Sequence, residues 1–286
     1  MVSLLKRQVL RRYPDWVAAY HDARLRRELR RRPIADTPQG FRFAGPSTMQ
    51  DGSFEPEEQA FLSARLQDAD VFVDVGANAG YFTCIARARG ARVIAVEPAP
   101  QNLELLFKNI RANGWNDVEV FPVGLAQQPG LGTLYGDGTA ASQVIRWAGL
   151  SETWQRTIPL TTLDTLLDSR FQGQRLVIKV DVEGAEDAVI GGGRATLARH
   201  PAPVWLVEVC FTENFPNGVN PHFRGVFDRF WRAGYSASSL EAGRPVGRED
   251  VERWVASGRR DFGYVSYVFE KPDERAGHDA PVEAAP

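Results

Sequence analysis

Short runs of apolar residues recur along this chain, and between some of them the apolar positions change to a helical spacing. The clearest helix has Leu103, Leu106, Phe107 and Ile110 at i, i+3, i+4 and i+7, and the dipeptide 113–114 (Asn-Gly) ends it. Strands that alternate with helices are typical of a parallel sheet covered on both faces, so the pattern predicts an α/β fold. We expect strands at Val71–Val75, Arg92–Val96, Val118–Val123, Arg175–Val182, Val204–Val209, Tyr235–Ser239 and Gly263–Glu270.

The chain divides into three parts by composition. Residues 1–32 have helical spacing, and residues 33–56 are rich in Pro, Gly, Ser and Thr, with a short expected strand at Phe41–Phe43. We therefore predict a basic helical extension with its linker at 1–56, one α/β domain at 57–271, and a disordered, low-complexity tail at 272–286.

Charge is distributed unevenly over the 286 residues. The formal net charge is only −2, which argues against a general nucleic-acid binder, but residues 1–32 carry +7 and the remainder −9. The arginines at 24–32 are dense enough to attract anionic phosphates at a membrane surface. The alternative, which we favour slightly, is a solvated helix face or a contact with the acidic body of a second copy of the chain.

Targeting and redox signals point to one compartment. No apolar run approaches the ~20 residues that span a bilayer, and charges interrupt the N-terminus before any signal-peptide core forms. The two cysteines, Cys84 and Cys210, stand among apolar residues and are expected to be buried thiols. We expect a cytoplasmic protein.

The stretch VFVDVGANAGYFT, residues 71–83, combines a strand, a glycine turn and the start of a helix. Gly76 permits a tight turn, and Gly80 permits a close approach of the backbone. Asp74 precedes the turn, and Glu97 ends the next strand, where an acid can accept from two ribose hydroxyls. The G-x-G-x-x-G turn of dinucleotide sites is absent, and a carboxylate at 74 would repel a pyrophosphate but could accept from an amine or a ribose. This favours S-adenosylmethionine, although a purely structural turn with Asp74 as a helix cap remains an alternative.

The chain resembles the FkbM-type S-adenosylmethionine-dependent methyltransferases over roughly residues 40–270. The resemblance rests on GSFEPEE, VFVDVGANAGYFT, VIAVEPAPQNLELLFKNIRANG, IPLTTLDTLL and RLVIKVDVEGAEDAVIGGG. It implies a Rossmann-like class I methyltransferase fold, with a mostly parallel seven-stranded sheet and helices on both faces. It also implies that the cofactor contacts Asp74, Gly76, Ala77, Asn78, Gly80 and Glu97, with Asn102 close by and Val123 and Gly124 near the adenine.

Candidate catalytic residues cluster at the ends of two later strands. Lys179, Asp181 and Glu183 fall on one side of an extended stretch, and Glu208 ends the next strand. Methyl transfer to an alcohol needs alignment and removal of a proton, so we expect Asp181 to orient or deprotonate the acceptor, assisted by Glu183, Glu208 and Lys179. An ion pair between Lys179 and Glu208, with Glu183 as a helix cap, is the structural alternative.

Other candidates are weaker. The carboxylates could hold a divalent cation, but no spacing requires a metal, and the histidines are scattered at His21, His200, His222 and His278. His222 is an alternative base. The segment Asn220–Phe223 resembles the N-P-P-F motif of amino-methylating enzymes, but it follows the fifth strand rather than the fourth, so we take it as coincidence.

The sequence therefore predicts a methyltransferase that acts on a hydroxyl of a sugar or another natural product, with a small molecule or a glycan as its substrate. Three alternatives stay open: methylation of an amine, an NAD-type oxidoreductase, and a non-catalytic binding module.

Overall fold

The computed structural model describes residues 24, 27–136, 141–149, 155–216 and 218–272. A seven-stranded sheet forms its centre, in the order β11-β12-β10-β9-β3-β4-β5, and β12 alone runs antiparallel to its neighbours. Its strands are β3 (Val71–Val75), β4 (Arg92–Val96), β5 (Glu119–Phe121), β9 (Leu176–Val180), β10 (Val204–Glu208), β11 (Ser236–Ser239) and β12 (Ser266–Glu270). All seven expected strands are thus present, most of them shorter than predicted, and the α/β class with a mostly parallel sheet is confirmed.

Alternate side chains of the central strands fill two cores, one on each face of the sheet. On β3, Val71, Val73 and Val75 belong to the larger core, whereas Phe72 belongs to the core on the opposite face. Every residue of β3 and β9 is buried, and both strands present apolar side chains to both faces of the sheet. The exceptions are Asp74 on β3 and Lys179 on β9.

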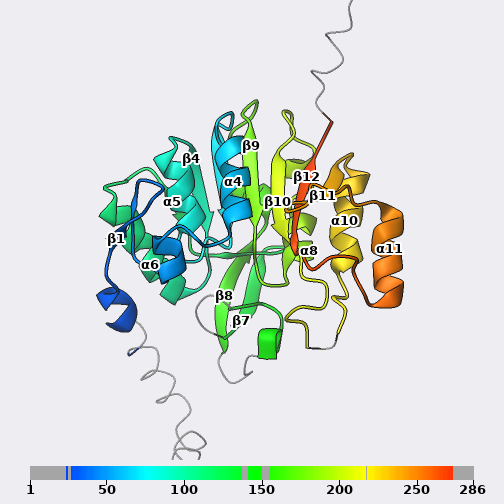
Figure 1. Ribbon diagram of the computed structural model, residues 1–286, viewed down its shortest axis with the longest axis horizontal. Helices are drawn as coiled ribbons and strands as arrows, with labels where there is room; N and C mark the ends of the chain where they lie inside the picture. Colours follow the sequence, from blue (N-terminus) through cyan, green and yellow to red (C-terminus); the bar gives the residue numbers. More distant parts are fainter. Residues whose placement is uncertain (1–23, 25–26, 137–140, 150–154, 217, 273–286) are drawn as a thin grey trace, which may run out of the picture.

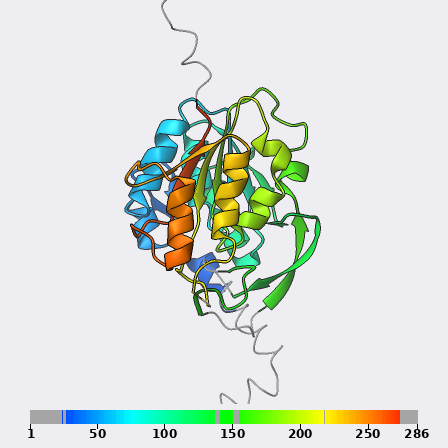
Figure 2. The same cartoon turned by 90° about the vertical axis from the view of Figure 1, so that its right-hand side faces the viewer.

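Helices cover the two faces in separate groups (Figure 1). One face carries α4 (Pro56–Arg65), α5 (Tyr81–Ala88) and α6 (Pro100–Ala112). The other carries α7 (Leu163–Leu167), α8 (Glu186–Gly191), α9 (Arg194–Leu197), α10 (Phe223–Arg232) and α11 (Arg248–Ser257). Figure 2, turned to the right-hand side of Figure 1, shows α11 in orange beside α10 in gold.

The expected helix at residues 103–110 is α6, but its buried face differs from the one expected. Leu106 and Ile110 are buried, whereas Phe107 is 38% exposed and Leu105 takes its place in the core. The polar side chains Asn102 and Asn109 on the same face are also buried, since both hydrogen-bond to neighbouring loops.

A second sheet, absent from the strand predictions, lies beside the carboxyl ends of the central strands. It has the order β6-β8-β7, formed by β6 (Gly124–Leu125), β7 (Gly130–Tyr135) and β8 (Gln155–Thr161). The short 3-10 turn Trp147–Gly149 lies between β7 and β8. The small helix α3 (Ser47–Gln50) precedes α4 in the chain.

The segment before α4 packs on the domain. Its two short strands, β1 (Ala35–Asp36) and β2 (Arg42–Phe43), pair with each other, which confirms a strand at Phe41–Phe43. Phe41 and Phe43 are buried against Tyr81 of α5. The linker therefore contributes to the core, and the domain boundary at residue 57 stays a prediction.

Of the basic helix predicted at residues 1–32, the structure describes only residue 24 and residues 27–32. Residues 27–31 are helical, and the Lys108 ammonium of α6 donates to the carbonyls of Arg30 and Arg32 at 2.8 and 2.6 Å, which caps this helix. Most of the predicted basic helix and nearly all of the predicted tail lie outside the described residues. No helix among the described residues is both long and apolar enough to cross a membrane.

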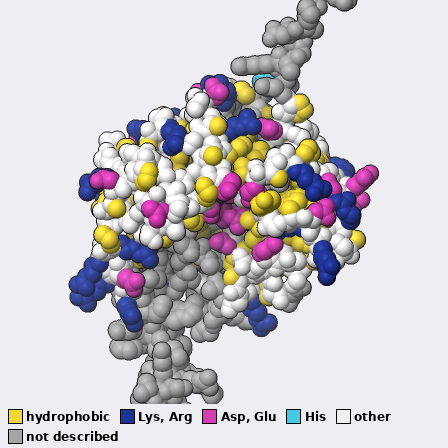
Figure 3. Space-filling model, viewed as in Figure 1, with side chains coloured by type: hydrophobic (Ala, Val, Ile, Leu, Met, Phe, Trp, Pro, Cys, Tyr) yellow, Lys and Arg dark blue, Asp and Glu magenta, His cyan; other side chains and the backbone are white. Residues whose placement is uncertain are grey.

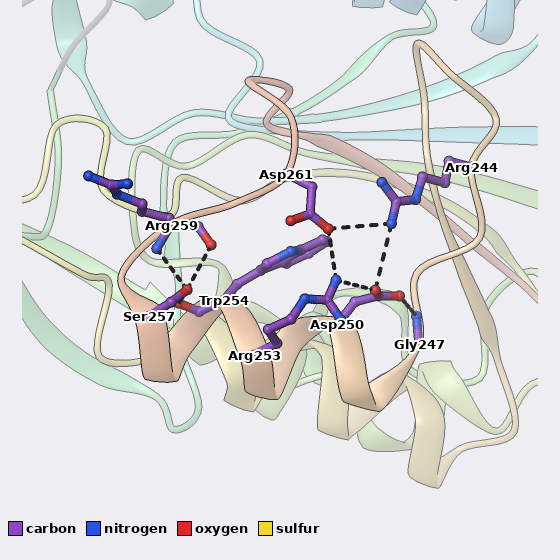
Figure 4. A network of polar contacts seen from close by, with 8 residues as sticks. All are labelled: Arg244, Gly247, Asp250, Arg253, Trp254, Ser257, Arg259 and Asp261. Atoms are coloured by element: carbon purple, nitrogen blue, oxygen red, sulfur yellow. Dashed lines mark hydrogen bonds and ion pairs between the residues drawn. The ribbon is translucent and has the colours of Figure 1, made fainter.

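Within the insertion between β11 and β12, polar contacts at the surface join α11 to the loops on either side of it (Figure 4). Asp261 accepts from Arg253 at 2.7 Å and from Arg244 at 3.4 Å, and Asp250 accepts from the Gly247 amide at 3.0 Å. These contacts join the loops on both sides of α11, remote from the cavity described next.

Candidate active site

A cavity opens at the carboxyl ends of β3, β4 and β9, the edge at which open α/β sheets bind ligands. About 550 Å³ of empty space, part of it open solvent, lies between its walls. Eight of its lining residues were expected from the sequence: Gly76, Asn78, Glu97, Asn102, Val123, Gly124, Asp181 and Glu183. The structure thus places cofactor candidates and catalytic candidates around one cavity.

The turn after β3 requires glycine at position 76. Gly76 has φ +87°, and a β-carbon there would lie 1.7 Å from the carbonyl oxygen of Asp181. The Asp181 amide in turn donates to the Val75 carbonyl at 2.9 Å. The turn and the end of β9 are therefore in backbone contact, which fixes Asp181 relative to the rest of the cavity.

Glu97 organises the neighbouring wall. Its buried carboxylate accepts from the backbone amides of Asn78 and Ala99, both at 2.8 Å, and from the Asn102 side chain at 3.2 Å. Burial raises the pKa of Glu97 to about 7, although the three N–H donors act in the opposite direction. Glu97 thus ties together the two loops that follow β3 and β4.

Three of the predicted cofactor residues do not line the cavity. Asp74 is 2% exposed and accepts a hydrogen bond of 2.6 Å from the Thr83 hydroxyl of α5. Burial raises the pKa of Asp74 to about 6. Ala77 is buried in the turn, and Gly80 (φ +84°) precedes α5 with its Cα facing Leu106. Their contacts with a cofactor stay predictions.

The second sheet supplies a wall of the cavity that the sequence indicated only in part. Val123 and Gly124 lie where β5 passes into β6, and Leu134 and Ala141 line the cavity from β7 and the segment after it. Leu134 packs with Ala99 and Ile158. Leu134 and Ala141 show only ordinary alternation, so no sequence signal distinguished them as part of a site, whereas the family resemblance implied Val123 and Gly124.

Lys179 lies beneath the cavity in full burial. Its ammonium is 2.9 Å from a carboxylate oxygen of Asp181 and 3.3 Å from one of Glu58 on α4. Burial opposes the charge on Lys179, but the carboxylates around it, Asp181 foremost, outweigh this and raise the pKa of the ammonium well above its usual value. The expected alternative, a pair between Lys179 and Glu208, is wrong, since Glu58 and Asp181 are its ion-pair partners.

Glu183 faces the cavity beside Asp181. The Trp147 indole donates to its carboxylate at 2.7 Å, and the Ser142 hydroxyl donates to its carbonyl at 2.5 Å. Burial raises the pKa of Glu183 to about 7, to which the Asp181 charge contributes. The helix-cap alternative for Glu183 is wrong, because α8 starts at Glu186 and the Glu186 carboxylate accepts from the Gly184 amide at 2.8 Å.

Glu208 lies behind Asp181 and does not line the cavity. The charge of Asp181 and burial raise the pKa of Glu208 well above its usual value. Its neighbour Cys210 and the distant Cys84 are both buried thiols, as expected. In the part of the chain that the structure describes, no group of three or more His, Cys, Asp or Glu side chains is arranged to hold a metal ion.

The remaining candidates have structural positions. His222 is exposed at the start of α10 and is not among the residues that line the cavity. Asn220 holds the loop before α10, because its side chain donates to the Cys210 carbonyl at 2.9 Å and accepts from the His222 amide at 2.8 Å. The N-P-H-F segment is therefore accounted for by loop structure.

Comparison with known proteins decides the family. The protein-family model described as "Methyltransferase FkbM domain" matches residues 74–237, more than half of the chain. The chain belongs to the FkbM methyltransferase family. The match spans the glycine turn, Glu97, Asp181 directly after β9, and Glu208 at the end of β10, whereas Glu58 and β12 lie outside it.

More distant similarities add little. No curated protein matches the chain significantly. Among solved structures, an O-methyltransferase from Bacillus cereus in complex with SAH is 16% identical with a TM-score of 0.41, over 78% of this chain and 84% of that one. The precorrin-6y C5,15-methyltransferase from Geobacter metallireducens GS-15 is 14% identical with a TM-score of 0.38, over 65% and 75%. Neither carries an argument about the substrate of this FkbM protein.

The donor set suits the cofactor that a methyltransferase of this family needs. Glu97 offers carboxylate oxygens to ribose hydroxyls, and Asn78 and Asn102 offer amide groups beside it. Val96 and Val123 supply apolar surface of the kind that an adenine ring requires. Among the described residues that line the cavity, none is a lysine or an arginine that would match a pyrophosphate.

Proposed function

We propose that this FkbM methyltransferase transfers a methyl group from S-adenosylmethionine to a hydroxyl group of a sugar or another natural product. The observation that carries the proposal is the shared cavity. Glu97, Asn78 and Asn102 line it together with the carboxylates of Asp181 and Glu183. A donor held by the first group would present its reactive end toward the second.

The residues of the chain then have distinct tasks. Glu97 and the asparagines bind and orient the donor, which supplies a methyl group already activated on a sulfonium. Asp181 orients the acceptor hydroxyl and takes its proton, and Lys179 holds the Asp181 carboxylate in place. Glu183 is a second acceptor for that proton, because a pKa of about 7 suits a general base near neutral pH.

A hydroxyl acceptor is favoured over an amine by this pair of carboxylates. A neutral amine already carries a reactive lone pair and needs little help from a base, whereas an alcohol must lose its proton as the bond to the methyl group forms. Two carboxylates at the cavity wall therefore suit an alcohol better.

Methyl transfer from radiolabelled S-adenosylmethionine tests the proposal. A panel of sugars and natural-product alcohols, with matched amines, would be incubated with the wild-type protein and with Asp181→Asn. We expect label in at least one alcohol with wild type, and a rate of labelling that is lower by at least about 100-fold with the variant. Label only in amines would overturn the hydroxyl assignment, and full activity of Asp181→Asn would overturn the role of Asp181.

A further inference from the structure

A chain of buried polar groups runs from β12 through α4 to the cavity. The Ser266 hydroxyl donates to one Glu58 oxygen at 2.6 Å, and the other Glu58 oxygen lies 3.3 Å from the Lys179 ammonium. Lys179 in turn contacts Asp181 at 2.9 Å. Only Asp181 reaches the cavity, since its side chain is 25% exposed, against 3% for Lys179 and 6% for Glu58.

The position of the Lys179 ammonium is set from three sides. Asp181 holds it at the strand end, Glu58 holds it from α4, and the Phe82 ring of α5 lies 4.8 Å away. A lysine has three N–H donors on a flexible stem, so one carboxylate alone would leave its ammonium free to move. The second carboxylate fixes it.

The start of α4 is built so that Glu58 faces β9. Glu55 adopts a left-handed backbone, φ 45° and ψ 61°, directly before Pro56 at the first position of the helix. Such a conformation costs about 1–3 kcal/mol for a non-glycine residue and persists only where surrounding contacts impose it. In the first turn of α4, Glu57 is exposed, whereas the residue after it, Glu58, is only 4% exposed.

The surroundings are acidic, which gives the lysine a second role. Beyond its two partners, Lys179 interacts electrostatically with Glu55 and Glu208, and Asp74 of β3 is also influenced by its charge. Figure 3 shows acidic side chains gathered near the centre of the face where α4 meets the central strands. Without a fixed cation beneath it, the Asp181 carboxylate would lie in an uncompensated acidic region.

We propose that Glu58 is a positioning residue: with Ser266 behind it, Glu58 holds the Lys179 ammonium beneath Asp181 and so fixes the carboxylate that faces the acceptor. Both Glu58 and Ser266 lie outside the matched FkbM domain, so the catalytic end of the site is completed by flanking segments of the chain. This inference rests on the proposed function for its catalytic consequence, but not for the contact itself.

The contact can be tested by NMR, without an acceptor, because the chain has only four lysines: Lys6, Lys108, Lys179 and Lys271. In protein labelled with ¹⁵N-lysine we expect one ammonium signal that exchanges slowly with water and that persists in Lys108→Arg and Lys271→Arg. In Glu58→Gln this signal should move or exchange at least about tenfold faster, while the control Glu57→Gln on the same helix should match wild type. An unchanged Lys179 signal in Glu58→Gln overturns the proposal.

The catalytic arm uses an alcohol identified by the labelling panel, with S-adenosylhomocysteine binding measured by calorimetry on the same preparations. Glu58→Gln should lower kcat by roughly 10- to 100-fold and leave the dissociation constant of S-adenosylhomocysteine within about twofold, because Glu58 neither lines the cavity nor hydrogen-bonds to Glu97. Ser266→Ala keeps the charge and should act in the same direction more weakly, which keeps the test open if Glu58→Gln unfolds. If kcat of Glu58→Gln equals that of the control Glu57→Gln, the proposal is overturned. If the wild-type protein does not bind S-adenosylhomocysteine, the proposed function is overturned instead.

Discussion

The two ends of the cavity are built in different ways. The donor end, formed by the turn 75–78 with Glu97 and Asn102, comes from one contiguous stretch, and its polar groups are satisfied by backbone amides nearby in the chain. The acceptor end, formed by Asp181 and Glu183, is held by side chains from distant segments: Trp147 lies 36 residues before Glu183, and Ser266 lies 208 residues after Glu58.

This difference affects how freely each end of the cavity can change between relatives. A backbone-built donor end is insensitive to most side-chain changes and suits a ligand shared by a whole family. A side-chain-built acceptor end can change with each flanking segment, which suits acceptors that differ between relatives. Three of the four predictions below separate the two ends, since changes at one should leave the other intact, and the fourth addresses the residue at which the ends touch.

The largest effect is expected for Asp181→Asn. The amide keeps the shape but cannot take a proton, so the rate of methyl transfer should fall by roughly 10²- to 10⁴-fold. Binding of S-adenosylhomocysteine should stay nearly unchanged, because Glu97 and the glycine turn are intact. Calorimetry and a methyl-transfer assay on the same preparation measure both; a parallel loss of affinity would mean that the two ends are not separable.

Gly76→Ala should damage both ends, since this residue is where they touch. Its β-carbon would meet the Asp181 carbonyl at 1.7 Å, and the φ of +87° is unfavourable for alanine. Gly90→Ala is the matched control: it has the same φ of +87° and nothing within 4 Å. Denaturant unfolding should show about 1–2 kcal/mol lost at Gly90 and on the order of 3 kcal/mol more at Gly76. Equal losses would refute the close contact.

Binding at the donor end should depend on pH through Glu97. Burial raises the pKa of Glu97 to about 7, and only the ionised carboxylate accepts freely from ribose hydroxyls. The affinity for S-adenosylhomocysteine should therefore rise as the pH increases through 7, by about tenfold between pH 6 and pH 8. Calorimetry on Glu97→Gln should show weaker binding without this dependence; a dependence that survives the substitution would belong to another group, such as Asp74.

The smallest effect is expected for Trp147→Phe at the acceptor end. The indole N–H stabilises the ionised form of Glu183, whose pKa burial raises to about 7. Removal of this N–H should raise the pKa of Glu183 further and shift the acid limb of the pH–rate profile to higher pH, by about one pH unit or less. Trp115→Phe, half-buried and outside the cavity, serves as the control. A limb that stays in place would assign the proton transfer to Asp181 alone.

The donor end was largely predictable from sequence because its chemistry is local. The strand, the glycines and the acid at 97 stand in a fixed order over a short distance, and the expected residues Gly76, Asn78, Glu97 and Asn102 do line one cavity. Asp74 shows the limit of such reasoning: a spacing gives the position along the strand but not the depth, and its carboxylate bonds Thr83 behind the cavity wall.

The acceptor end was predictable only in part. Alternation along β9 brought Lys179 and Asp181 together, but the partner of Lys179 could not be inferred, because which helix faces a strand is decided by tertiary packing. Glu58 stood in the quoted GSFEPEE block with no signal to separate it from Glu57. Trp147 lies between β7 and β8, two strands that the sequence predictions missed because they are glycine-rich or polar and half-exposed.

Calorimetric titration with S-adenosylhomocysteine, with NAD as the control ligand, tests the central claim most directly. The account predicts micromolar binding of S-adenosylhomocysteine to wild type and none of NAD, with the affinity preserved in Asp181→Asn and reduced in Glu97→Gln. Binding of NAD alone, or of neither ligand, would contradict the assignment of the cavity as a methyl-donor site.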